Sequence, residues 1–220
     1  YAHKLRHPRP PSPDQIFGQA FHLLALEGRE VFDAQVIAAP SFDKRTKKGK
    51  EESAEFARVN TGKLVLDPDD MAACVSMFEE LKLHPIFDLL QTCKTEMTVT
   101  ADIKGVPCKG KIDAFDDDVI IDVKTTRDAS VLSFTNSIHS YRYVFQAAFY
   151  RDLLRLNKIS TSEYFIIAIE KGAPHGIGIY QLTKKTLDDE MTLIYSTLER
   201  LKECQRVGVW PAYDTEPFVI

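Results

Sequence analysis

Residues 94–124 carry the pattern that most constrains the fold, because polar and apolar side chains alternate there between two turn signals. The apolar positions of the first run are Met97, Val99, Ala101 and Ile103. Alternation with a period of two predicts a half-buried strand. Lys104-Gly105 can turn the chain into a second strand over 106–115, and residues 116–118, all aspartate, can turn it into a third over 119–124. Three strands joined by short turns predict an antiparallel sheet in the middle of the chain.

Helical patterns lie on both sides of this predicted sheet. The sequence Ser12-Pro13-Asp14-Gln15 offers a capping residue, a proline suited to the first helical position and the partner of a capping box. A helix is therefore predicted through His22 to about Glu27, with Gly28 as its stop. Further helices are predicted at 52–60, from Asp67-Pro68, at 86–91, at 141–156 and from Thr183 onward, and further strands at 164–169 and 177–182.

We expect a single α/β domain over residues 1–220, because no repeat or low-complexity linker divides the chain. A chain of 220 residues is long enough to bury a substantial core. Residues 1–12 are rich in proline and predicted to be extended, and residues 40–50 are predicted to form a flexible basic loop. The chain begins with Tyr1 rather than Met, so we expect it to be a fragment of a longer protein.

The composition argues against several classes of protein. No apolar run approaches the roughly 18 residues of a membrane span and no signal peptide opens the sequence, so no membrane partner is expected. The four cysteines lack CxxC spacing: Cys74, Cys93, Cys108 and Cys204. Such scattered cysteines argue against a zinc ribbon or a disulfide framework and suit a reducing cytoplasm.

The formal net charge of −4 speaks against a nucleic-acid partner, but the positive charges are clustered. One cluster comprises His3, Lys4, Arg6, His7 and Arg9, and a second comprises Lys44, Arg45, Lys47, Lys48 and Lys50. Such clusters are either solvated loops or contacts to phosphate, which are electrostatic and independent of base sequence. The charge alone does not decide between them.

The predicted hairpin over 106–124 places three charged residues together. If the chain turns about residues 117–118, Asp113 faces Asp122 with their Cβ atoms about 4.5–5.5 Å apart. Two such carboxylates repel unless a divalent cation with a preference for oxygen ligands lies between them. Lys124 projects from the same face as Asp122, and the Val123 carbonyl can also reach a metal.

This arrangement suits phosphodiester hydrolysis. The scissile phosphate is anionic, so catalysis needs a cation that neutralises it and lowers the pKa of a bound water. A lysine beside the metal can orient that water and take or share its proton. The alternative is a surface hairpin with acidic residues at its turn and a salt-bridged lysine.

Two pairs of residues at helical spacing lie on either side of the hairpin. Gly18 and His22 share one helix face, where the glycine leaves room for close approach to the imidazole. Gln146 and Tyr150 have the same spacing on the helix after the hairpin. The alternatives are a packed core histidine and an ordinary amphipathic helix.

Taken in order, these residues resemble the PD-(D/E)XK nucleases, in the branch that contains RecE, lambda exonuclease and the RecB nuclease domain. The matching motifs are Gly18…His22, Gly110…Asp113, Asp122-Val123-Lys124 and Gln146…Tyr150. The text of residues 18–27 is most similar to the RecE type, and the resemblance covers about residues 15–182. It implies a restriction-endonuclease-like core, with a central, mostly antiparallel mixed sheet flanked by helices.

The resemblance also implies roles for individual residues. His22, Asp113 and Asp122 would ligate Mg²⁺, or Mn²⁺ in its place, with help from the Val123 carbonyl. Lys124 would be the catalytic lysine, and Gln146 and Tyr150 would organise the site or contact DNA. Position alone suggests phosphate contacts for Thr125, Thr126 and Arg142, and Glu96 is a further acidic candidate without an assigned role.

Two cofactors of related enzymes are not expected. Some relatives bind an iron–sulfur cluster through one cysteine before the histidine and three near the C-terminus. This sequence has no cysteine before Cys74 and only Cys204 near its end, so no cluster is predicted. The phosphate-binding loop of ATP-driven motors is also missing from the sequence, so ATP is not predicted.

The function implied is a Mg²⁺-dependent exonuclease that degrades linear double-stranded DNA from an end, in the 5′ to 3′ direction. The resemblance also implies a homo-oligomer (a trimer or tetramer), a role in recombination or end resection, a single-strand-annealing partner protein and a bacterial or phage origin. A single-strand or flap nuclease of the same fold is the first alternative. A DNA-binding module without activity and a structural domain of a larger protein are the others.

Overall fold

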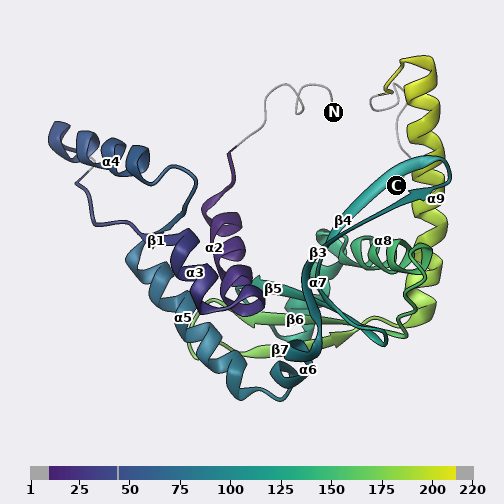
Figure 1. Cartoon of the computed structure of the whole chain (residues 1–220), viewed down its shortest axis with the longest axis horizontal. Helices are drawn as coiled ribbons and strands as arrows, with labels where there is room; N and C mark the ends of the chain where they lie inside the picture. The colour runs from purple at the N-terminus through teal and green to yellow at the C-terminus, as the bar shows by residue number, and fades with distance from the viewer. Residues whose placement is uncertain (1–9, 44, 212–220) are drawn as a thin grey trace.

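A computed structural model describes residues 10–43 and 45–211 (Figure 1). The helices are α2 (Pro13–His22), η1 (Leu23–Glu27), α3 (Arg29–Gln35), α4 (Lys47–Val59), α5 (Pro68–Leu83), α6 (Ile86–Thr92), α7 (Val131–Ser140), α8 (Tyr143–Leu156) and α9 (Lys184–Val207). The strands are β1 (Val36–Ala38), β2 (Leu64–Leu66), β3 (Lys94–Ile103), β4 (Val106–Phe115), β5 (Val119–Thr126), β6 (Glu163–Glu170) and β7 (Ile177–Gln181).

Five strands form the central sheet in the order β3-β4-β5-β6-β7. All neighbours are antiparallel except β5 and β6, which run parallel and are joined through α7 and α8. The predicted fold class, a mostly antiparallel mixed sheet flanked by helices, is confirmed. Strands β1 and β2 form a separate parallel pair.

The sheet separates two hydrophobic cores. One core contains Ile121 and Val123 of β5 and lies against α2, η1, α3, α5 and α6, whereas the other contains Ile120 and lies against α7, α8 and α9. Figure 1 shows the two groups of helices on opposite sides of the sheet. Since β5 is covered on both faces, its sequence is apolar at consecutive positions rather than alternating. Any charged residue on this strand is therefore held in a largely buried environment.

The first predicted helix is present, with a change of helical form inside it. The Ser12 hydroxyl accepts a hydrogen bond from the Gln15 backbone amide, and the Gln15 side-chain oxygen accepts one from the Ser12 backbone amide, which completes the predicted capping box. The α-helix ends at His22, and residues 23–27 continue as a π-helix. Gly28 ends the helical segment with φ of 90°, a conformation that glycine adopts readily.

The predicted flexible loop over residues 40–50 is wrong in its second half, where α4 already begins at Lys47. Thr46 caps this helix by accepting a hydrogen bond from the Gly49 amide at 3.0 Å. Lysines of the first turn also form i,i+4 ion pairs with glutamates of the next, which favours the helix. Lys44 and residues 1–9, with their predicted extended structure and basic cluster, lie outside the described residues.

The helices after the hairpin also differ from expectation. Helix α7 was not predicted, and the helix expected from Tyr141 begins at Tyr143. Arg142 separates the two helices with a left-handed backbone, φ 58° and ψ 43°. The final helix was predicted correctly, since Thr183 caps α9. Over the described part of the chain, none of the helices combines the length and apolarity that crossing a membrane requires.

Candidate active site

The candidate site lies where β4 and β5 separate. Phe115 pairs with Ile120 and Ala114 with Ile121, so the predicted register of the hairpin is confirmed. The ladder ends there, and Asp113 and Asp122 are the next opposed positions. Instead of continuing the ladder, the Val123 amide donates a hydrogen bond of 2.8 Å to Oδ2 of Asp113. This bond fixes the Asp113 carboxylate at the fork between the strands and leaves its Oδ1 for other partners.

Glu96 on β3 is the acidic neighbour of Asp113. Thr95 pairs with Ala114 and Met97 with Ile112, so the intervening Glu96 lies opposite Asp113. Its backbone is left-handed, with φ of 55°, which is uncommon for a non-glycine residue. Its carboxylate forms an ion pair with Lys111 and is 13% exposed. Three acidic residues thus occupy one row across β3, β4 and β5.

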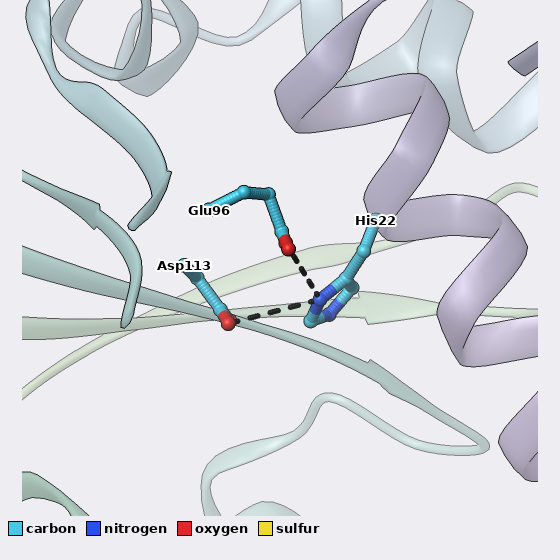
Figure 2. Close-up of side chains that lie close together, drawn as sticks. All are labelled: His22, Glu96 and Asp113. Carbon is cyan, nitrogen blue, oxygen red and sulfur yellow. Dashed lines mark ion pairs between the residues drawn. The ribbon is translucent and has the colours of Figure 1, made fainter. Parts of the chain in front are cut away.

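His22, the last residue of α2, completes the group from the other side (Figure 2). Its Nε2 lies 2.8 Å from the Val123 carbonyl oxygen. Because a carbonyl only accepts, Nε2 must carry the hydrogen, and Nδ1 is left to bind either a proton or a cation. Nδ1 lies 3.7 Å from Oε1 of Glu96 and 3.7 Å from Oδ1 of Asp113.

These three side chains have the chemistry of a divalent-metal site. One ligand atom each from His22, Glu96 and Asp113 lies within 4.8 Å of the others. Two carboxylate oxygens suit a hard cation such as Mg²⁺ or Mn²⁺, and a neutral imidazole nitrogen can join them. Metal-binding histidines usually donate their second N–H to a carbonyl or carboxylate, as His22 does to Val123. The Val123 carbonyl, predicted to bind metal directly, is used here to orient the imidazole.

Lys124 and Asp122 form an ion pair next to this group. Nζ of Lys124 lies 2.6 Å from Oδ2 of Asp122, and the Gln146 amide donates to Oδ1 at 3.1 Å. Asp122 is only 2% exposed, so a charge there requires both partners. Of the acidic residues predicted as metal ligands, the structure thus brings Asp113 to His22 and holds Asp122 against the lysine.

The electrostatics of the site follow from this burial. Desolvation raises the pKa of Asp122 to about 6 against the opposing effect of Lys124. Burial lowers the pKa of Lys124, but the carboxylates of Asp122 and Asp113 outweigh it and the net shift is upward. The same balance of burial against Asp113 and Glu96 raises the pKa of His22. The upward shift favours the ammonium form of Lys124 at neutral pH.

The two motif glycines allow close packing around the site. A Cβ atom on Gly110 would lie 2.7 Å from the ring of Tyr150 and 2.9 Å from Leu153, so only glycine allows α8 to lie this close to β4. A Cβ on Gly18 would lie 3.7 Å from Oγ1 of Thr125, which is an ordinary contact. Gly110 is thus required by the position of Tyr150, whereas Gly18 leaves space between α2 and β5.

The predicted phosphate-contacting residues do not share one location. Thr125 and Thr126 continue β5 beyond Lys124 and line a cavity of about 710 Å³. The Arg142 guanidinium instead pairs with Glu190 of α9 at 3.0 Å and lies over the Phe145 ring. The cavity therefore has hydroxyl groups from β5 in its wall, while Arg142 braces α8 against α9.

Two neighbours of the site had no predicted role in it. Glu96 could have been placed by counting back from the Lys104-Gly105 turn, since the register that pairs Ile103 with Val106 also puts Glu96 opposite Asp113. Tyr143, whose ring lies 5.1 Å from Nζ of Lys124, gave no such signal because it sits after the unpredicted helix α7.

A protein of known structure shares this architecture. The crystal structure of a protein from Eubacterium rectale, named as a putative exonuclease, has a TM-score of 0.70 at 15% identity over 98% of this chain and 80% of that chain. The crystal structure of SSO0001 has a TM-score of 0.32 at 14% identity over 87% of this chain and 81% of that chain, too low to indicate a shared fold. No curated protein matches the sequence. Residues 5–216 match the family model described as a PDDEXK-like domain of unknown function (DUF3799), and the chain therefore belongs to this PDDEXK-like family.

Proposed function

We propose that the protein is a divalent-metal-dependent nuclease that hydrolyses the DNA backbone. The observation that carries this proposal is the grouping of His22, Glu96 and Asp113 beside the Lys124–Asp122 ion pair. The alternative, a surface hairpin with a salt-bridged lysine, does not explain why a histidine from α2 and a glutamate from β3 both lie beside the same aspartate. The PDDEXK-like fold supports a nuclease independently of these distances.

His22, Glu96 and Asp113 would hold the ion, which we propose to be Mg²⁺, with Mn²⁺ as a substitute. The fit rests on the donor set: Nδ1 of His22 and Oδ1 of Asp113 face each other while the second atom of each group is hydrogen bonded elsewhere. Asp122 is the natural additional ligand, since it is the next acidic position along the row. When bound, the ion supplies a water of lowered pKa and neutralises charge on the phosphate.

The protein's own residues would position and neutralise the reacting phosphate. The carboxylates of Asp122 and Asp113 raise the pKa of Lys124, so its ammonium group would pair with a phosphate oxygen and donate a hydrogen bond to it. Asp122 fixes the ammonium on one side, and Gln146 fixes Asp122. Tyr150, packed on Gly110, holds α8 and hence Gln146 at this distance from β5.

We further propose an exonuclease that acts on linear double-stranded DNA from an end, in the 5′ to 3′ direction. The RecE-like text of residues 18–27 supports this substrate, and the similar fold named as a putative exonuclease motivates testing DNA ends. A ring-like homo-oligomer of three or four copies, a single-strand-annealing partner and a role in recombination or end resection belong to the same proposal.

The test uses end-labelled linear duplex, covalently closed circular duplex and single strands, each incubated with the protein and Mg²⁺. We expect the linear duplex to be degraded while closed circles survive, and all cleavage to stop in excess chelator. Efficient cutting of circles would indicate an endonuclease, and preference for single strands or flaps would favour the alternative nuclease. Binding without cleavage at any metal concentration would leave only a DNA-binding module.

The variant Lys124→Ala tests whether Lys124 is required for cleavage. We expect this variant to lose cleavage while metal and DNA binding remain largely intact, because one lost charge weakens phosphate binding only modestly. Lys82→Ala is the matched control, since Lys82 is also ion-paired and lies over an aromatic ring, but its partner is Glu79 of α5. Equal loss of activity in both variants would contradict a specific role for Lys124.

A further inference from the structure

We propose that Tyr141 and Tyr143 form a stacking surface for an unpaired nucleobase beside the cleaved phosphate. The preferred substrate would then be a DNA end whose terminal base pair is open. This inference rests on the proposed nuclease function and specifies the form of the DNA end that the site accepts.

The geometry of the two rings is that of a stacking surface. Their centroids lie 5.7 Å apart and their planes differ by 26°, so the rings are stacked on each other. Tyr141 is 70% exposed, so much of its surface is accessible to a ligand. A nucleobase can stack on such a ring regardless of its identity, because every base has a π-face.

The ring of Tyr143 connects this surface to the proposed catalytic lysine, Lys124. Nζ of Lys124 lies 5.1 Å from the centroid of the Tyr143 ring. Tyr143 also packs on Phe134, which packs on Tyr180 at 4.8 Å, and the Tyr180 hydroxyl donates to the Ala129 carbonyl at 2.5 Å. Tyr143 is therefore held by packing against the core. A base stacked on Tyr141 would be separated from Lys124 by the rings of Tyr141 and Tyr143.

The backbone between the tyrosines is held in an unfavourable conformation. Arg142 is left-handed, with φ of 58°, which a non-glycine residue adopts only when its surroundings determine it. Its guanidinium is fixed by Glu190 and by the ring of Phe145. Arg142 thus acts as a positioning residue, since the sharp corner it makes lets residues two apart stack their rings.

The cavity next to the rings has a suitable size and lining. It measures about 710 Å³ and includes Tyr141 and Tyr143 in its wall together with the hydroxyl groups of Thr125, Thr126, Ser133 and Ser137. Its charged residues are balanced, with Arg127 and Lys171 against Asp14 and Asp128. The rings can stack on a base, and the hydroxyl groups can hydrogen-bond the sugar and phosphate that carry it. The balanced charge gives no strong attraction for a run of phosphates.

The substrate must therefore present a base that has left its pair. A paired base inside a duplex is stacked on both faces and offers none to Tyr141. Opening one terminal pair releases such a face, and stacking on the ring then offsets part of the cost of opening.

The test measures DNA binding with Ca²⁺ in place of Mg²⁺, since Ca²⁺ takes the same oxygen ligands, with intact DNA verified on a gel. Three duplexes are compared: one with mismatched terminal pairs, one with blunt ends and one closed by hairpins at both ends. The proteins are the wild type, Tyr141→Ala, Tyr141→Trp and the control Leu132→Ala, which removes an equally exposed apolar side chain from α7 outside the cavity. A 2-aminopurine base at the mismatched end reports stacking through quenching of its fluorescence.

We expect the wild type to bind the mismatched end most tightly and to quench its 2-aminopurine. Tyr141→Ala should lose about 5- to 100-fold in affinity for that end and the quenching, but bind the hairpin-closed duplex as the wild type does. Tyr141→Trp should retain both properties, and Leu132→Ala should change neither. The stacking proposal would be overturned if wild type and Tyr141→Ala bound the mismatched end with equal affinity. It would also be overturned if Tyr141→Ala lost as much affinity for the blunt end as for the mismatched end. Either result would leave the proposed nuclease function standing. No binding of any duplex by the wild type would overturn the proposed function as well.

Discussion

Replacing His22 by alanine separates a metal ligand from a packing residue. His22 makes one hydrogen bond to the backbone, of 2.8 Å, to the Val123 carbonyl, and its side chain is 25% exposed. A bond of this kind contributes about 0.5–1.5 kcal/mol to stability. For a domain of this size, 1 kcal/mol corresponds to about 2–4 °C. We therefore expect the melting temperature of metal-free His22→Ala to fall by only about 1–6 °C.

The effect on metal binding should be much larger. Glu96 and Asp113 remain, but the nitrogen between them is lost, and the half-saturating Mn²⁺ concentration should rise by about tenfold or more. Thermal melting at increasing Mn²⁺ concentrations measures both quantities on one sample. His139→Ala, at an exposed histidine of α7, is the control and should match the wild type. A lower metal-free melting temperature with an unchanged Mn²⁺ response would place His22 in the core and refute its role as a ligand.

Three further predictions concern pH, packing and thiol reactivity. The pKa of His22 is raised, so the stability that its bound proton adds to the protein without metal is lost as the pH rises through that pKa. A metal ion binds only the unprotonated imidazole, so metal binding becomes easier over the same pH range. Stabilisation by Mn²⁺ should therefore grow between about pH 6 and pH 8.5, and an equal response at both ends would contradict this linkage. Gly110→Ala should cost about 1–3 kcal/mol, measured by denaturant unfolding, because its methyl group would meet the Tyr150 ring; unchanged stability would show that α8 can shift freely. Burial raises the pKa of Cys74 to about 12, so iodoacetamide at pH 8 should modify it only after unfolding, and rapid labelling of the native protein would contradict its burial.

The central hairpins were predictable because local sequence specifies them. Alternation over residues 97–103 and two short turns determine both the strands and their register, down to Phe115 opposite Ile120. Membership of the PD-(D/E)XK superfamily, predicted from four short motifs, is confirmed by the family model. These motifs are recognisable because each combines residue types that packing alone would not select.

The missed elements depend on contacts that are distant in sequence. Helix α7 buries only Phe134 and Ile138 in ten residues, so its apolar pattern is too sparse to indicate a helix. The parallel pairing of β5 with β6 depends on a crossover through two helices, which period-two patterns do not encode. The start of α4 was missed because a run of lysines resembles a solvated loop until the glutamates one turn later are considered.

In the candidate site, the residue types were predicted but their pairing was not. The opposed Asp113 and Asp122 were expected to share an ion, whereas the structure places Lys124 and Gln146 on the two oxygens of Asp122. Glu96 takes the place beside His22 because the left-handed backbone at this position and the ion pair with Lys111 orient its carboxylate. Such side-chain choices depend on three elements at once and have no local sequence signal.

The most direct test of the metal-dependent mechanism is single-turnover cleavage of end-labelled linear duplex at increasing Mn²⁺ concentrations, by wild type and by Glu96→Gln. This substitution keeps the size of the side chain and removes the charge that faces Nδ1 of His22. We predict no cleavage by either protein without metal, and a half-saturating Mn²⁺ concentration about tenfold or more higher for Glu96→Gln. Cleavage by the wild type in excess chelator, or superimposable Mn²⁺ curves for the two proteins, would contradict the account.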